Sequence, residues 1–166
     1  RINARRLFLL GCLMVGMSYA ADFTWLSSPA SGNWNETDTN WTGAVSVWTS
    51  AATNSAIFGA SGTQTIAAGV VTLSNLTFDA DGYTISGGPF LMYGGPTVGA
   101  GLSAVVTAAV TNNVGLFDKR GTGTLVLDSG TSRTNLFSTL RVSEGLLQIT
   151  GGTHEIYTND LNNINI

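Results

Sequence analysis

Short pairs of apolar residues, spaced two positions apart and followed by glycine-rich corners, constrain this chain more than any other feature. The two members of such a pair share one face of a β-strand. The pairs are Leu125 and Leu127, Leu140 and Val142, and Leu147 and Ile149. A short strand of this kind can bury its apolar row only against similar strands above and below it. The pattern therefore predicts the stacked coils of a β-solenoid.

The residue types present favour strands and exclude helices. The 166 residues include 21 Gly, 22 Thr, 15 Ser and 13 Asn, but only three Glu, two Gln and one Lys. Surface helices are built mainly from those scarce residues, so a helical bundle and a doubly wound α/β enzyme are both excluded. Because 43% of the residues are apolar and 10% are charged, the chain can bury enough surface to fold. We expect one all-β domain.

Residues 1–20 have the pattern of a cleaved signal peptide. A basic start is followed by an uncharged run and then by small residues at the positions that signal peptidase reads: Arg1, Arg5 and Arg6, then 7–17, then Ser18 and Ala20. We expect cleavage after Ala20 and a mature chain that starts at Ala21. The uncharged stretch is shorter than a transmembrane helix, so no permanent membrane span is expected.

Two other export routes are compatible with the same segment. Arg5-Arg6 resembles the core of a twin-arginine signal, and Leu9-Leu10-Gly11-Cys12 resembles a lipobox that would place a lipid on Cys12. Cys12 is the only cysteine, so the mature chain has no disulfide and no thiolate chemistry after cleavage at Ala20. The protein is expected to pass through the periplasm to the outer-membrane surface or the extracellular space.

The mature chain divides into a Trp-rich region, 21–58, and a solenoid region, 59–166. The tryptophans of the first region are separated by turn-forming residues, which predicts short strands: Trp25, Trp34, Trp41 and Trp48. We interpret this region as a cap that covers the free edge of the stack. The second region has apolar runs divided by Gly-Gly, Asp-Gly and Asn-Asn pairs: 65–66, 70–78, 83–85, 90–93 and 102–110.

The segment 116–152 resembles the autotransporter-associated β-strand repeat. That pattern is a Lys, then Gly-x-Gly-Thr-Leu-x-Leu, a variable middle, and Val-x-x-Gly-x-Leu-x-Ile. The matching residues are Lys119, Gly121, Gly123, Thr124, Leu125, Leu127, Val142, Gly145, Leu147 and Ile149. The middle departs at 133–137, where the family has Asn-x-Tyr-x-Gly, so a corner of different shape is expected there. The resemblance implies a right-handed parallel β-helix.

The start of the mature chain is similar to the segment that often precedes such repeats in large exported bacterial proteins. The similar residues are Trp25, Gly32-Asn33-Trp34, Asn40-Trp41, Ile57-Phe58-Gly59 and 76–88. This likeness implies an N-terminal fragment of a longer protein, with more repeats and in some relatives a membrane barrel or a sorting signal. A stack of this kind would end in an open edge, through which we expect self-association.

Few residues are candidates for chemistry or binding. The tryptophans suit either a sugar-stacking platform or an N-terminal core. Asp79-x-Asp81-Gly82 begins like a calcium loop but lacks the remaining ligands, and Asp-Gly is also typical of a tight turn. His154 and Glu155 are adjacent on a strand and therefore face opposite ways. We interpret Asp118, next to Lys119-Arg120, as part of a solvated corner.

These features lead to a functional hypothesis. Four basic residues against ten acidic ones in the mature chain exclude nucleic acid as a partner. No catalytic residue, metal site or cofactor is predicted. We expect a non-enzymatic, structural or passenger-type β-solenoid of an exported bacterial surface or secreted protein. One alternative is an adhesin-like module that binds surface glycans through its tryptophans. The other is a fragment of a polysaccharide-active β-helix enzyme, whose site needs clustered carboxylates near Arg or Lys.

Overall fold

The computed structural model describes residues 20–60, 64–130, 134–160 and 164–165, and within these ranges every regular element is a strand. The predicted signal peptide, apart from Ala20, lies outside the described residues. The all-β class expected from the composition is confirmed.

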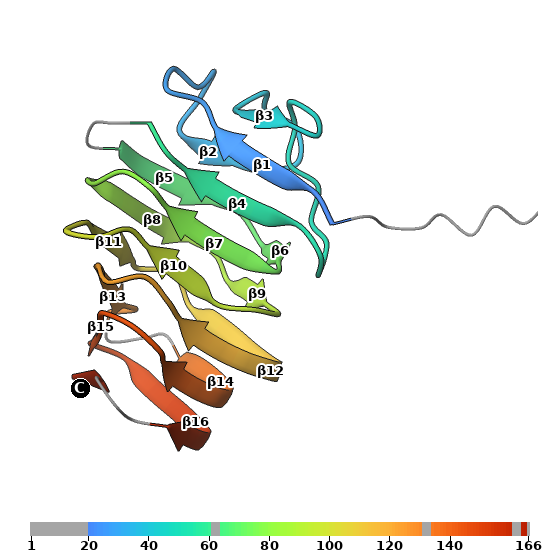
Figure 1. Ribbon diagram of the computed structural model, residues 1–166. Helices are drawn as coiled ribbons and strands as arrows, with labels where there is room; N and C mark the ends of the chain where they lie inside the picture. Colours follow the sequence, from blue (N-terminus) through green and yellow to red (C-terminus); the bar gives the residue numbers. More distant parts are fainter. Residues whose placement is uncertain (1–19, 61–63, 131–133, 161–163, 166) are drawn as a thin grey trace, which may run out of the picture.

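The strands are arranged in three sheets that run along a stack (Figure 1). Sheet A contains β3 (Trp41–Gly43), β1 (Asp22–Trp25), β4 (Ser55–Phe58), β7 (Asn75–Phe78) and β10 (Pro96–Val98). Sheet B contains β2 (Asn33–Trp34), β5 (Gln64–Ala68), β8 (Tyr83–Gly87), β11 (Ser103–Val106), β13 (Thr124–Asp128), β15 (Leu146–Thr150) and β17 (Ile164–Asn165). Sheet C contains β6 (Val71–Leu73), β9 (Phe90–Met92), β12 (Val110–Lys119), β14 (Thr134–Val142) and β16 (Thr153–Asp160).

The chain visits the sheets in turn, and each strand pairs in parallel with the equivalent strand of the next coil. The result is a right-handed β-solenoid of about five coils (Figure 1). Inward-facing side chains form columns along the stack. In sheet B, Leu125 lies opposite Leu147 and Leu127 lies opposite Ile149, and all four are buried. Burial of each such side chain contributes about 1.5–3 kcal/mol.

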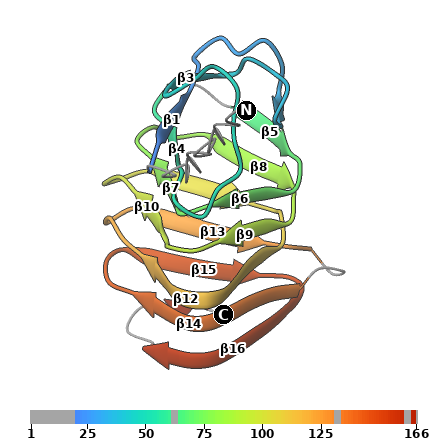
Figure 2. The same ribbon diagram turned by 90° about the vertical axis from the view of Figure 1, so that its right-hand side faces the viewer.

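The coils change shape below β10. The first half of β12 pairs with β9, and the register between β12 and β14 shifts between Asn112 and Leu116. Just after β12, Arg120 bridges to Thr97 of β10, so the second half of the long strand continues sheet A. Figure 2 shows β12, β14 and β16 curving round the lower part of the stack. Two strands per coil therefore replace three.

The apolar run at 70–78 is divided by a corner into β6 and β7. Ser74 forms this corner, where its N–H donates to the Asn54 carbonyl and its own carbonyl accepts from Gly94. The Asn75 amide oxygen accepts from the N–H of Gly95 in the next coil. The polar pair Ser74-Asn75 in the middle of an apolar run is the sequence signal for this turn.

At the N-terminal end, β3 lies antiparallel against β1, with Trp41 opposite Trp25. This strand occupies the outer edge of sheet A that a parallel coil would otherwise extend (Figure 1). The parallel register reaches into the predicted cap region, because β1 pairs in parallel with β4. β3 is only three residues long, and a very short edge strand gives further strands little backbone to pair with.

Candidate functional site

The four tryptophans form an aromatic cluster inside the N-terminal end of the solenoid. Trp25, Trp34, Trp41 and Trp48 are each at most 1% exposed. The ring centroid of Trp34 lies 5.1 Å from that of Trp41, 5.0 Å from that of Trp48 and 5.3 Å from that of Phe90. An exposed sugar-stacking platform is therefore not what these residues form, because no ring face is open to a ligand.

Hydrogen bonds fix only part of the cluster. The indole N–H of Trp25 donates to Gln64 at 2.7 Å, and that of Trp48 donates to Ser50 at 3.2 Å. The indole nitrogens of Trp34 and Trp41 are buried without a hydrogen-bond partner among the described residues. Packing between rings therefore holds these two side chains, at angles between tilted and edge-on.

Sequence reasoning missed the buried residue that holds the loop between β2 and β3. Asn40 accepts a hydrogen bond from the Ser31 N–H at 2.9 Å and donates to the Asn33 carbonyl at 2.6 Å. Because Asn33 and Asn40 directly precede Trp34 and Trp41, these bonds hold the backbone from which both rings enter the cluster. The repeated Asn-Trp pair was the available signal.

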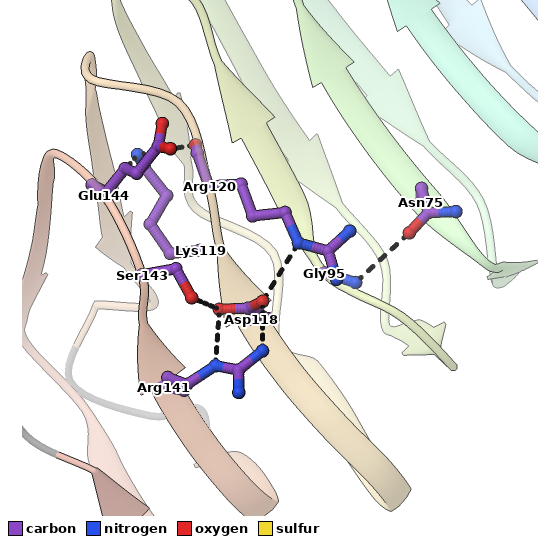
Figure 3. A network of polar contacts seen from close by, with 8 residues as sticks. All are labelled: Asn75, Gly95, Asp118, Lys119, Arg120, Arg141, Ser143 and Glu144. Atoms are coloured by element: carbon purple, nitrogen blue, oxygen red, sulfur yellow. Dashed lines mark hydrogen bonds and ion pairs between the residues drawn. The ribbon is translucent and has the colours of Figure 1, made fainter.

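A second group of polar residues lies at the corner where β12 and β14 lead into β13 and β15 of sheet B. We call it the polar corner, and its members are Asp118, Lys119, Arg120, Arg141, Ser143 and Glu144. Asp118 accepts hydrogen bonds from Arg120 Nε at 2.9 Å, Ser143 Oγ at 2.7 Å, and Arg141 Nη2 and Nε at 2.7 and 3.1 Å (Figure 3).

The prediction of a solvated corner at Asp118 is wrong. The Asp118 side chain is 3% exposed and Lys119 is fully buried. The physical reason is the register: β12 and β14 place Asp118 directly opposite Arg141 and Lys119 opposite Val142. A residue that neighbours Asp118 only through this pairing covers its carboxylate, and the local sequence does not display it.

Hydrogen bonds from Arg141, more than any other cause, hold the pKa of Asp118 well below its ordinary value of 3.8. Desolvation opposes this shift, while Ser143 and Arg120 add to it. A carboxylate with such a low pKa is a poor general base, because it has little tendency to take a proton near neutral pH. The arrangement suits a fixed link between coils.

Lys119 points to the other side of the strand, into the solenoid. Its ammonium group donates to four backbone carbonyls, those of Arg120 at 2.9 Å, Gly121 at 2.7 Å, Gly123 at 3.0 Å and Glu144 at 3.2 Å. Burial lowers the pKa of Lys119, and the negative charge of Glu144 opposes that shift. Lys119 is thus a buried cation with backbone ligands.

The remaining sequence candidates also serve the stack. The Asp81 carboxylate accepts the N–H of Ser103 in the next coil at 2.8 Å. Within the described residues no three His, Cys, Asp or Glu side chains gather in a way that would hold a metal ion. Asp79 is exposed beside the tight turn at Gly82.

His154 belongs to a column of polar residues that crosses three coils. The Asn135 amide oxygen accepts from the Val110 N–H at 2.8 Å, which directs the amide nitrogen toward Ser129 at 3.2 Å and His154 Nδ1 at 3.2 Å. Glu155, the next residue on β16, is exposed. The pair does not meet as a catalytic dyad, because adjacent strand residues face opposite ways.

One shallow groove of about 400 Å³ lies at the corner between sheets B and C. Its lining residues are Gly87, Gly88, Pro89, Ala109 and Thr134. None of these five residues carries a titratable side chain.

The fold and these two clusters define a β-solenoid in which aromatic, acidic and basic side chains are used between coils. Comparison with family models, curated proteins and solved structures found no match to this chain. The described part of the chain contains no helix with the length and apolar character needed to span a membrane.

Proposed function

We propose that this chain is a non-enzymatic, structural β-solenoid of an exported bacterial surface or secreted protein, of the passenger type. One observation carries the proposal: the side chains best suited to chemistry or ligand contact are buried as links between coils. Asp118 is saturated by Arg120, Arg141 and Ser143, and Lys119 by backbone carbonyls.

Export is supported by the pattern of residues 1–20 and by the likeness of 116–152 to a repeat of exported proteins. The mature chain lacks cysteine and so needs another source of stability. Continuous backbone ladders between coils, with buried apolar columns, supply it.

The polar corner gives little support to the hypothesis of an enzyme, although it brings a carboxylate close to two arginines. A polysaccharide lyase or hydrolase needs a carboxylate that can reach the substrate and exchange a proton. The carboxylate of Asp118 is covered, and its pKa is too low for that task. The binding alternative is weakened in the same way by the burial of the tryptophans.

Expression of the full chain in a Gram-negative host tests the export part of the proposal. We expect processed protein in the periplasm or medium, with Ala21 at its N-terminus in intact-mass and N-terminal sequencing measurements. The variant Cys12→Ser should be processed in the same way, and Arg5→Lys with Arg6→Lys should still be exported. Uncleaved protein in the cytoplasm would contradict the proposal, and lipid on Cys12 would point to the lipobox route.

Activity and binding assays on the exported chain test the structural part. We expect no product from a panel of acidic and neutral polysaccharides and no retention on immobilised glycans. Turnover that disappears in Asp118→Asn, while the circular dichroism spectrum stays unchanged, would establish an enzyme and refute a purely structural role.

A further inference from the structure

Four backbone carbonyl oxygens converge on one buried point in the polar corner. The distances from Lys119 Nζ to these oxygens run from 2.7 Å for Gly121 to 3.2 Å for Glu144. Three of the carbonyls, from Arg120, Gly121 and Gly123, belong to the turn that follows β12. The fourth, from Glu144, belongs to the corner of the next coil, so oxygens from two coils contact the ammonium group. Figure 3 shows Lys119 beside Glu144.

These oxygens depend on a cation to different degrees. The Arg120 carbonyl also accepts the N–H of Val98, and the Gly123 carbonyl also accepts the N–H of Leu146. The carbonyls of Gly121 and Glu144 accept hydrogen bonds from the ammonium group of Lys119. A buried carbonyl that loses its donor costs free energy. The corner therefore needs a hydrogen-bond donor or a cation at this point.

The glycines around the corner let the carbonyls turn toward the cation. Gly145 has a φ of +68°, which side-chain-bearing residues rarely adopt. A Cβ added at Gly145 would collide with the carbonyl oxygens of Gly121 and Gly123, which are two of the four oxygens around Lys119. Glycine at this position and lysine at 119 therefore belong to one structural unit.

We propose that these four carbonyl oxygens form a cation site that spans two coils and that the Lys119 ammonium group occupies. When this side chain is removed, the site binds a small monovalent cation of the ammonium type. Rings of carbonyl oxygens replace the hydration shell of monovalent cations in proteins. Divalent cations such as calcium favour carboxylate ligands, whereas the four atoms within hydrogen-bond distance of Lys119 Nζ are neutral carbonyl oxygens.

The unmodified chain allows a first test, because Lys119 is its only lysine. In the exported chain labelled with [15N]lysine, we expect one ammonium signal with slowly exchanging protons near neutral pH. An amine-specific acetylating reagent should leave Lys119 unmodified in the folded chain and should modify it in denaturant. Rapid acetylation of the folded chain, or an ammonium that exchanges like that of free lysine, would overturn the proposal.

The second test removes the resident cation. Lys119→Ala should lower the unfolding temperature and leave a cavity in which a small cation can bind. Lys119→Met should also lower the unfolding temperature, but its uncharged side chain fills that cavity. Ammonium chloride or propylammonium chloride should raise the unfolding temperature of Lys119→Ala by several degrees more than an equal concentration of sodium chloride. The Lys119→Met variant and the unmodified chain should show no such difference.

Leu125→Ala provides the matched control, because Leu125 is buried a few residues away and binds no cation. If Lys119→Ala does not fold in sodium buffer, recovery of its strand circular dichroism signal in ammonium or propylammonium chloride becomes the measurement. The proposal is overturned if Lys119→Ala is as stable as the unmodified chain. It is also overturned if ammonium ions restore Lys119→Ala no better than Leu125→Ala.

Discussion

Asp118 and Arg141 lie directly opposite each other on the neighbouring parallel strands β12 and β14, and two hydrogen bonds join the carboxylate to the guanidinium. The carboxylate is 3% exposed, while the Arg141 side chain remains 39% exposed. A paired contact of this kind fixes direction as well as distance. It links two coils at a position where the backbone ladder turns a corner.

Loss of this contact should destabilise the stack. Asp118→Asn is expected to lower the free energy of unfolding by about 2–3 kcal/mol, because hydrogen bonds to charged groups contribute about 1.5–3 kcal/mol and part of the loss is screened at Arg141. Denaturant titration measures the change. Arg120→Gln is the control, since Arg120 is 56% exposed and belongs to the same strand region as Asp118. Arg141→Gln, which removes the contact between coils, should lower the free energy of unfolding more than Arg120→Gln. Equal decreases for the two variants would show that the contact between coils is not what makes Asp118 stabilising.

The same carboxylate should make stability depend on pH in the acid range. The pKa of Asp118 is depressed in the folded chain, so its contribution is complete above the ordinary value of 3.8 and is lost as the pH falls below that value toward the folded pKa. We expect the free energy of unfolding to decline with a steeper slope in the unmodified chain than in Asp118→Asn. The pKa of Asp38 is also lowered, chiefly by its hydrogen bond from Ser31, so Asp38→Asn should be compared in the same titration.

The inward register of sheet B predicts a contrast between two adjacent residues. Leu127→Asp should cost about 4 kcal/mol or more, because Leu127 is buried against Ile149 and an unpaired charge there has no partner. Val126→Asp should cost far less, since Val126 faces outward and is only half-buried. Thermal unfolding of both variants measures the contrast. Similar unfolding temperatures would refute the register.

The aromatic cluster should behave as a core and not as a binding surface. Trp34→Ala is expected to lower the free energy of unfolding by about 3–5 kcal/mol, as large-to-small changes of buried aromatic residues do. Val70→Thr, at a side chain that is 75% exposed, should stay within about 0.5 kcal/mol of the unmodified chain. Tryptophan fluorescence should resist quenching by iodide. A fluorescence change on addition of oligosaccharides would contradict the assignment of these rings to the core.

The alternation of apolar and polar residues along a strand made the inward positions of this fold predictable from the sequence. Features that depend on pairing between residues distant in the sequence could not be predicted in this way. The inward positions of Leu125 and Leu127 follow from their spacing, since strand neighbours face opposite ways. The burial of Asp118 depends on Arg141, which reaches it only through the register of β12 and β14. For the tryptophans the composition alone leaves two interpretations open, because aromatic side chains suit both a core and a sugar surface.

The links at the polar corner also matter for a solenoid under tension. Backbone hydrogen bonds between stacked coils run along the stack, so a force applied to its two ends pulls each rung open and peels the coils one after another. The bond from Arg141 to Asp118 and the bond from Lys119 to the Glu144 carbonyl cross the same boundary as the backbone rungs of β12 and β14. These side-chain bonds resist the applied force together with the backbone hydrogen bonds. We therefore expect the polar corner to raise the force needed to separate these two coils.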